Sequence, residues 1–336
     1  MLTLILLTGG LALILASAEF FTNGVEWLGK KLKLSEGAVG SILAAVGTAL
    51  PESMIPIIAI LFGTGKAAEE IGIGAILGAP FMLTTLALPI AGVIGLVHKI
   101  EGKKRKFMLI DPSVMMRDLK FFLIVYLMAF LATFLPQGSI RVVVAVLLVV
   151  TYFLYVAHTL KGGSTLEEAH LRPLYFARKQ HDPATPVVVL QVLTALGGII
   201  FGAHLFVDGI EHLAELLHVS PFVLSIIIAP IATELPEKFN SVIWLLRGKD
   251  TLALGNITGA MVFQSSLIPA LGIAFTPWAL SKLAAISVIL ALTAGALVYF
   301  NLKLKKVLRP TILAFNGTLY LVFLILVLTL GDTLVS

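Results

Sequence analysis

Gly47-Thr48-Ala49-Leu50-Pro51-Glu52 is the stretch on which the interpretation of this chain rests. It lies inside an apolar run, residues 38–62, that is long enough to cross a bilayer as a helix. A related stretch, Ala232-Thr233-Glu234-Leu235-Pro236-Glu237, lies inside a second apolar run, residues 222–246. Both copies follow the pattern small residue, threonine, any residue, leucine, proline, glutamate. One copy alone could be an ordinary proline kink, but two copies in matching apolar runs indicate a functional site.

Each copy brings oxygen atoms into a region where a membrane protein has few. A carboxylate in mid-membrane costs about 2.5–3.5 kcal/mol on insertion scales, so its presence indicates a function. Proline removes one backbone donor and frees the carbonyl four residues earlier. Carboxylate, hydroxyl and carbonyl oxygens are the ligands that hard cations such as Ca²⁺ prefer. We therefore predict a cation site formed by Glu52, Glu237, Thr48, Thr233 and the backbone carbonyls of Gly47 and Ala232. Candidate secondary ligands are Gln264, Asn240, Thr84 and Thr85.

The composition is that of a polytopic membrane protein. Of the 336 residues, 58% are hydrophobic and 13% are charged, whereas soluble proteins average about 25% charged residues. Because there is no cysteine, the chain has neither disulfides nor a thiolate metal or redox site. We expect the lipid bilayer and small transported cations as partners, and neither a cofactor nor nucleic acid. The sequence leaves monomer and homo-oligomer equally open.

Ten membrane-spanning helices are predicted, at about 20 residues for each crossing. The predicted spans are residues 2–28, 38–62, 70–97, 119–135, 140–160, 186–216, 221–246, 251–275, 279–301 and 310–331. If both termini lie outside, most of the 24 lysines and arginines fall in inside loops, as the positive-inside rule requires. No cleavable signal peptide is evident, because the first apolar run lacks a basic start. The compact chain suits a prokaryotic plasma (inner) membrane.

An internal repeat relates the two halves of the chain. A shift of 185 residues places residues 19–52 on residues 204–237 without a gap, and the two motifs coincide. A shift of 181 residues places Gly74-x-x-x-Gly78 on Gly255-x-x-x-Gly259. Glycines at this helical spacing make a smooth face for close contact with another helix.

The repeat divides the chain into three parts. We predict a first five-helix repeat at residues 1–160, a cytoplasmic linker at residues 161–185 and a second five-helix repeat at residues 186–336. Because five is odd, the second repeat enters the membrane from the opposite side. Such inverted repeats are typical of secondary transporters, whose site lies near the midplane between the repeats.

These residues resemble the cation/Ca²⁺ exchanger superfamily, which includes the sodium/calcium exchangers. Members carry two inverted repeats of five helices. Each repeat has a Gly-Thr-Ser-Leu-Pro-Glu-like motif in its second helix and a Gly-Asn-x-x-Gly-Ser-Asn/Asp-like motif in its third. The resemblance implies an all-α membrane transporter. It also implies that Glu52 and Glu237 are the central Ca²⁺ ligands and that Thr48 and Thr233 bind partly through their carbonyls.

The chain departs from the family pattern at several ligand positions. The serine after the threonine is Ala49 in the first copy and Glu234 in the second. The Ser-Asn/Asp positions of the third helices read Ala79-Pro80 and Ala260-Met261. By analogy, oxygen ligands associated with Na⁺ are missing, and Met261 is a candidate ligand for a softer metal. The alternative for Met261 is packing inside the membrane.

Glu234 has two alternative roles. Lys238 lies four residues later, a spacing that favours an ion pair on one face of a helix. In the first alternative Lys238 neutralises Glu234 and leaves Glu237 to bind the cation. In the second, Glu234 joins the metal site or takes up protons during transport.

The predicted function is secondary active antiport, with export of Ca²⁺ in exchange for H⁺ or Na⁺ by alternating access. Two facing carboxylates can exchange a metal ion for protons, because both compete for the same charge. The alternatives are transport of Mn²⁺ or Mg²⁺, and a degenerate exchanger fold with a sensing or scaffold role. We predict no enzyme activity, since the chain has no His-Glu-x-x-His, Gly-x-Ser-x-Gly or P-loop motif.

Overall fold

The computed structural model of the chain describes residues 2–31, 44–100, 103–161 and 172–335. Helices make up almost all of this part, apart from a small antiparallel hairpin of β1 (Lys99–Ile100) and β2 (Lys103–Lys104). The helices are α1 (Leu2–Lys31), α3 (Ala44–Leu61), α4 (Gly65–Met82), α5 (Leu88–Val97), α6 (Pro112–Leu131), α7 (Ser139–Lys161), α8 (Thr185–Leu217), α9 (Pro221–Leu246), α10 (Asp250–Phe275), α11 (Lys282–Lys305), α12 (Pro310–Phe315) and α13 (Gly317–Val335). Single helical turns are η2 (Leu83–Ala87), η3 (Ala132–Phe134) and η4 (Tyr175–Ala177).

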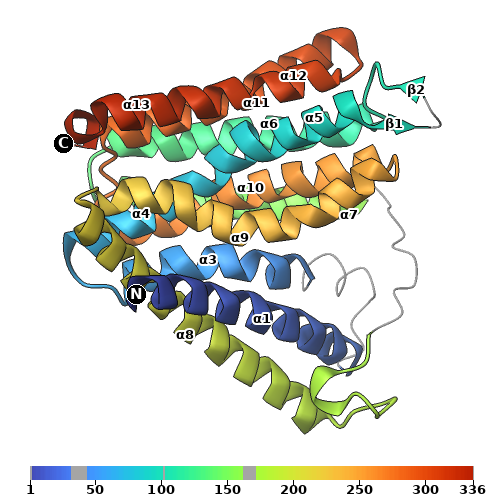
Figure 1. Cartoon of the computed structure of the whole chain (residues 1–336), viewed down its shortest axis with the longest axis vertical. Helices are drawn as coiled ribbons and strands as arrows, with labels where there is room; N and C mark the ends of the chain where they lie inside the picture. Colours follow the sequence, from blue (N-terminus) through green and yellow to red (C-terminus); the bar gives the residue numbers. More distant parts are fainter. Residues whose placement is uncertain (1, 32–43, 101–102, 162–171, 336) are drawn as a thin grey trace.

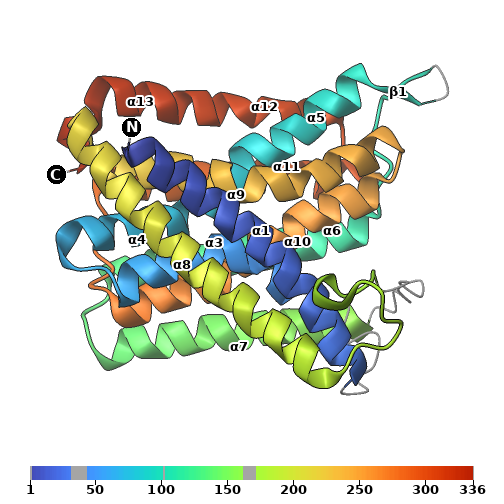
Figure 2. The ribbon, with the colours of Figure 1, turned by 60° about the horizontal axis from the view of Figure 1, so that its bottom comes forward.

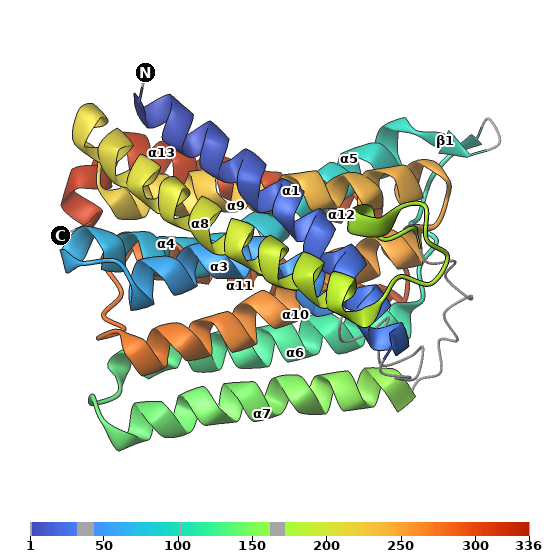
Figure 3. The same cartoon turned by 90° about the horizontal axis from the view of Figure 1, so that it is seen from below.

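The helices run side by side in a bundle (Figure 1). α1 and α8 form one side of the bundle, α11, α12 and α13 form the opposite side, and α3, α4, α9 and α10 lie between them. Both termini lie at one end, and the β1–β2 hairpin lies at the other (Figures 1 and 3). Seven of the described helical segments are long and apolar enough to cross a membrane. α3 and α9 contain shorter apolar stretches, Glu52–Leu61 and Pro221–Glu234, so the total of ten crossings stays a prediction.

α1 and α8 cross each other in close contact along the surface of the bundle (Figure 2). A Cβ atom added to Gly10 would lie 2.8 Å from the carbonyl oxygen of Gly202, and one added to Gly202 would lie 2.9 Å from that of Gly10. Only glycine permits backbones to approach so closely, and such contacts associate helices in lipid. These two glycines therefore set the crossing point of α1 and α8.

The predicted fourth span, residues 119–135, begins too late in the sequence. In the structure α6 covers Pro112–Leu131, and the carboxylate of Asp111 caps its first turn. Hydropathy placed the start later because the first turns of α6 are charged. The buried Asp118 is satisfied there, since Thr258 in α10 donates a hydrogen bond of 2.8 Å to its carboxylate.

Two predicted spans, residues 70–97 and residues 310–331, are each interrupted in the middle. The span predicted at residues 70–97 continues from α4 into α5 through the π-helical turn η2. Pro89 follows this turn and has no N–H group to donate to the helix. The side-chain amide of Asn316, at the junction of α12 and α13, donates to the carbonyls of Ala294 (3.0 Å) and Thr84 (3.5 Å). Asn316 thereby joins the two interruptions.

The described end of the predicted linker holds the end of α1 next to the start of α8. The indole of Trp27 donates to the carbonyl of Arg172 at 2.9 Å. The amide of Asn23 accepts a hydrogen bond from the backbone of Tyr175 at 3.2 Å and from the side chain of Gln191 in α8 at 3.0 Å. This network ties α1, the linker and α8 together at the hairpin end of the bundle.

Candidate cation site

The four helices that carry the repeated motifs surround one place in the bundle. α3 and α9 carry the two proline-glutamate motifs, and α4 and α10 carry the two glycine motifs. Each of these four helices contacts the other three. The tertiary structure therefore brings the four helices that carry the motifs into mutual contact.

Glu52 points into the protein interior from the middle of the predicted second span. Its side chain is 7% exposed, and the neighbouring Ser53 and Met54 are also buried. α3 stays helical through Pro51. Gly47 and Thr48 lie in the first turns of α3, and their side chains are outside the described part of the structure. The structure therefore describes two parts of the first motif, which are the buried carboxylate of Glu52 and the helical backbone.

The second motif occupies the middle of α9. Thr233 is 1% exposed, and its hydroxyl donates to the carbonyl of Ala229 at 2.9 Å. A hydroxyl oxygen that donates its proton keeps its lone pairs as acceptors. Ala232 is half-buried, and Glu237 lies in the helix with its side chain outside the described set. The Thr233 oxygen can therefore serve a cation on the inner face of α9.

Glu234 and Lys238 form a buried ion pair. The carboxylate oxygen Oε2 lies 3.1 Å from Nζ, and the side chains are 0% and 7% exposed. Neither oxygen of Glu234 receives a hydrogen bond of good geometry from a described residue, so the contact is an ion pair without directional hydrogen bonding. The structure thus contains the Glu234–Lys238 ion pair that the first alternative for Glu234 predicts.

α10 contributes polar groups from the side of the second glycine motif. Asn256 donates to the hydroxyl of Ser241 in α9 at 3.0 Å, which fixes the two helices to each other. Gln264 is 1% exposed, and its Nε2 has no hydrogen-bond partner among the described residues. Met261 is fully buried and belongs to the main apolar core. Both alternatives for Met261, packing and metal binding, stay open.

The structure buries both Thr84, a predicted secondary ligand, and Asp118, which the sequence analysis did not single out. The hydroxyl of Thr84 donates back to the carbonyl of Pro80 in its own helix at 2.8 Å. Asp118 lies outside every predicted span, yet it is buried. Its hydrogen bond with Thr258 joins α6 to α10, and Thr258 lies one helical turn before Met261. The missed signal was the helix start at Asp111-Pro112, a capping residue followed by proline.

The first glycine pair lies in a close helix contact. A Cβ atom added to Gly74 would lie 2.8 Å from the carbonyl oxygen of Phe222, and one added to Gly78 would lie 2.6 Å from that of Ile226. α4 and α9 are therefore in direct backbone contact, which confirms the predicted role of the first pair. The 185-residue shift relates Phe222 and Ile226 to residues 37 and 41, which are not among the described residues. The corresponding contact of Gly255 and Gly259 therefore lies outside the described part of the structure.

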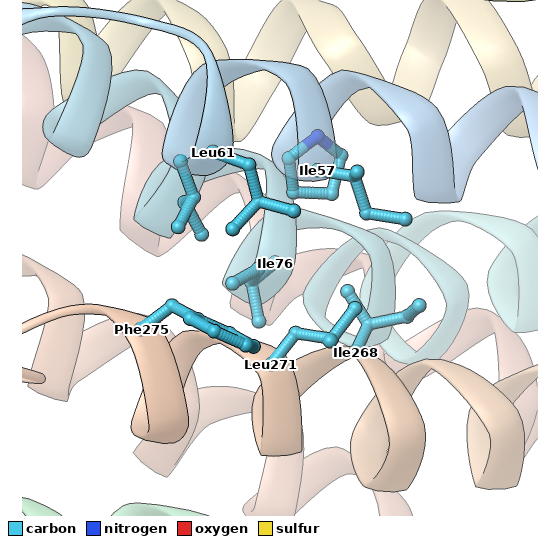
Figure 4. A pocket seen from close by; sticks show the side chains of 8 residues that line it. Ile57, Leu61, Ile76, Ile268, Leu271 and Phe275 are labelled. Carbon is cyan, nitrogen blue, oxygen red and sulfur yellow. The ribbon is translucent and has the colours of Figure 1, made fainter.

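An apolar cavity lies between Glu52 and the end of the bundle that carries the termini (Figure 4). Its lining consists of Pro56, Ile57, Ile60 and Leu61 from α3, Ile76 from α4, and Ile268, Leu271 and Phe275 from α10. Without polar groups it offers no ligand to a cation, so the cavity is not itself the site.

Among the described residues, no three His, Cys, Asp or Glu side chains come together as a metal cluster. The side chain of Glu237 is not among those residues.

Comparison with known proteins identifies the family. The family model described as "Sodium/calcium exchanger protein" matches residues 2–161 and 187–330. The chain belongs to this family. The exchanger is 26% identical over 329 residues to the putative antiporter CaxA of Alkalimonas amylolytica, covering 94% of this chain and 96% of that protein.

Solved structures of exchangers have the same fold. The H⁺/Ca²⁺ exchanger CAX matches with a TM-score of 0.73 at 18% identity, covering 97% of this chain and 82% of that chain. The sodium-calcium exchanger NCX_Mj matches with a TM-score of 0.58 at 20% identity, covering 98% of this chain and 100% of that chain. The family is one of membrane transporters, and at these identities the two structures establish the fold of this exchanger.

Proposed function

We propose that this exchanger is a secondary active antiporter that exports Ca²⁺ in exchange for H⁺ or Na⁺. The observation that carries the proposal is the pair of proline-glutamate motifs, one in each half of the chain, on helices that contact each other. Glu52 and Glu237 are the central ligands in this proposal. Thr48, Thr233 and the carbonyls of Gly47 and Ala232 complete the ligand set.

The proposed membrane arrangement is ten crossings in two inverted five-helix repeats with both termini outside. The position of both termini at one end of the bundle supports an even number of crossings. The lysine-bearing hairpin and the described end of the linker lie at the opposite end, which suits an inside location under the positive-inside rule. We place the protein in a prokaryotic plasma membrane, since its relative CaxA comes from a bacterium.

The inverted repeat supports transport by alternating access. In an inverted repeat, each half can adopt the arrangement that the other half has, which provides a second arrangement of the same fold. Here α9 is packed on Gly74 and Gly78 of α4. In this proposal the α4–α9 contact opens in the second arrangement.

The choice of counter-ion follows from the missing ligands. Ala79 and Ala260 replace serines of the family pattern, and neither side chain can coordinate Na⁺. Carboxylates that lose Ca²⁺ can bind protons instead, since both ions compete for the same oxygens. We therefore place H⁺ before Na⁺ as the counter-ion.

Flux measurements in proteoliposomes test the proposal. We expect ⁴⁵Ca²⁺ uptake under an imposed pH gradient or Na⁺ gradient, and loss of uptake in the Glu52→Gln, Glu237→Gln double variant. Glu19→Gln is the matched control, because Glu19 in α1 is 56% exposed and pairs with Arg172 outside the site. Absence of ⁴⁵Ca²⁺ uptake by folded protein under both gradients would contradict the proposal, and Mn²⁺ and Mg²⁺ would then be tested in the same vesicles.

A further inference from the structure

The Glu234–Lys238 ion pair is the feature of the site that the proposed function does not use. Both side chains belong to α9 and are buried, and Oε2 of Glu234 lies 3.1 Å from Nζ of Lys238. Among described residues, the ammonium of Lys238 is the only group that compensates the charge of Glu234. Glu234 directly follows Thr233 in the motif, and Lys238 directly follows Glu237, so the pair overlaps the end of the motif.

Only the second repeat contains this pair. The 185-residue shift places Ala49 at the position of Glu234 and Ser53 at the position of Lys238. The second repeat therefore differs from the first by one negative and one positive charge, added together. Buried ion pairs are weak evidence of stability, because desolvation offsets the attraction of the charges. Because the first repeat lacks this pair, we look for the role of the Glu234–Lys238 pair in function rather than in folding.

The charge of the site can be counted from the four helices that surround it. Apart from the motif residues, their charged side chains are Lys66, Glu69 and Glu70 at the start of α4 and Asp250 at the start of α10. Asp250 is paired with Arg105 at 2.8 Å. The middle of the four helices thus holds Glu52, Glu234 and Glu237 against Lys238, a net charge of two negative units. One divalent cation or two monovalent cations balance that charge.

We propose that the ammonium of Lys238 is a tethered cation that takes the place of one counter-ion. The site would then exchange one divalent cation for two monovalent cations, without net movement of charge across the membrane. Without Lys238, three carboxylates would require a third monovalent cation in each cycle. The inference rests on the proposed antiport function and specifies its coupling. Lys238 sets the stoichiometry in this account, and Glu234 binds Lys238 instead of the transported ion.

The test is the effect of membrane potential on the Ca²⁺ accumulation ratio at equilibrium. Proteoliposomes are loaded so that the gradient that drives wild-type uptake is fixed, and the potential is clamped with K⁺ and valinomycin. Each net charge moved per Ca²⁺ shifts the ratio by roughly fifty-fold per 100 mV. We expect no shift for the wild type. We expect Lys238→Gln to move charge, and its accumulation to depend on a third monovalent cation.

The charge-balanced double variant Glu234→Gln, Lys238→Gln is the matched control. It keeps the net charge of the wild type, so we expect it to exchange without any effect of potential. If folded Lys238→Gln transports nothing while the double variant transports, charge balance is still the requirement and the proposal is supported. Gel filtration in detergent establishes folding for each variant.

Three results would overturn the proposal that Lys238 acts as a tethered cation. They are a wild-type accumulation ratio that shifts with potential, a Lys238→Gln variant that still exchanges without moving charge, and a folded double variant that transports nothing. If the wild type takes up no Ca²⁺ under either gradient, the antiport proposal itself fails. Charge movement during measurable uptake by the wild type overturns the coupling alone, so the two failures are distinguishable.

Discussion

Replacing Gly78 with alanine is expected to open the contact between α4 and α9. The added methyl group would lie 2.6 Å from the carbonyl oxygen of Ile226 and 2.6 Å from the ring of Pro230. Both neighbours are rigid, so the helices must separate, and overpacking of this kind typically costs about 1–3 kcal/mol. If a second arrangement exists in which this contact is open, that cost shifts the equilibrium toward it by about 5- to 150-fold.

A single introduced cysteine measures the shift, because the chain contains no cysteine of its own. Ser225 is fully buried at this contact, where its hydroxyl donates to the carbonyl of Ile71 at 2.7 Å. Ser225→Cys should react slowly with a membrane-impermeant maleimide, and at least about five times faster when Gly78→Ala is added. Gly197→Ala in α8 is the control, since Gly197 is exposed and no described atom lies within 4 Å of the added methyl group. Equal labelling with and without Gly78→Ala, or equal acceleration by Gly197→Ala, would refute the reasoning.

Three further predictions concern stability, measured as thermal unfolding in detergent. Arg105→Ala should destabilise the protein by about 3–5 kcal/mol, because it leaves the fully buried Asp250 without its partner at 2.8 Å. Asn316→Leu should cost about 1–3 kcal/mol, since it removes the donor to the buried carbonyl of Ala294. Asp111→Ala should cost about 1 kcal/mol as a lost helix cap. Hydrogen bonds from Ser113 lower the pKa of Asp111, so the stabilisation by the cap is present above the usual pKa of aspartate and is lost as the pH falls through the lowered pKa.

Two of these stability predictions, those for Arg105 and Asp111, have a control on the same part of the chain. Lys106→Ala removes an exposed basic residue next to Arg105 and should leave the unfolding temperature unchanged. For the helix cap, Asp111→Asn keeps a good capping residue, so it should retain most of the stability and lose the pH dependence. An Arg105→Ala variant as stable as Lys106→Ala would contradict the importance of the buried pair.

Much of the architecture follows from the sequence, because lipid makes the pattern of apolar runs informative. The prediction at residues 221–246 coincides with α9, and those at 186–216 and 251–275 differ from α8 and α10 by one residue at each changed end. The repeated proline-glutamate motif indicated the exchanger family, which the family match confirms. The predicted ligands and the division into two five-helix repeats stay predictions.

Tertiary structure decided where charged and polar residues fit inside the bundle. The start of α6 was misplaced because hydropathy treats Asp118 as a surface residue, while Thr258 and Tyr155 from two other helices satisfy it in the interior. The spacing of Glu234 and Lys238 allowed an ion pair, but only the packing around α9 buries it. The sequence shows which groups are polar. The hydrogen-bond and ion-pair partners that offset the cost of burying a polar group come from helices far away in the chain, so only the tertiary structure identifies them.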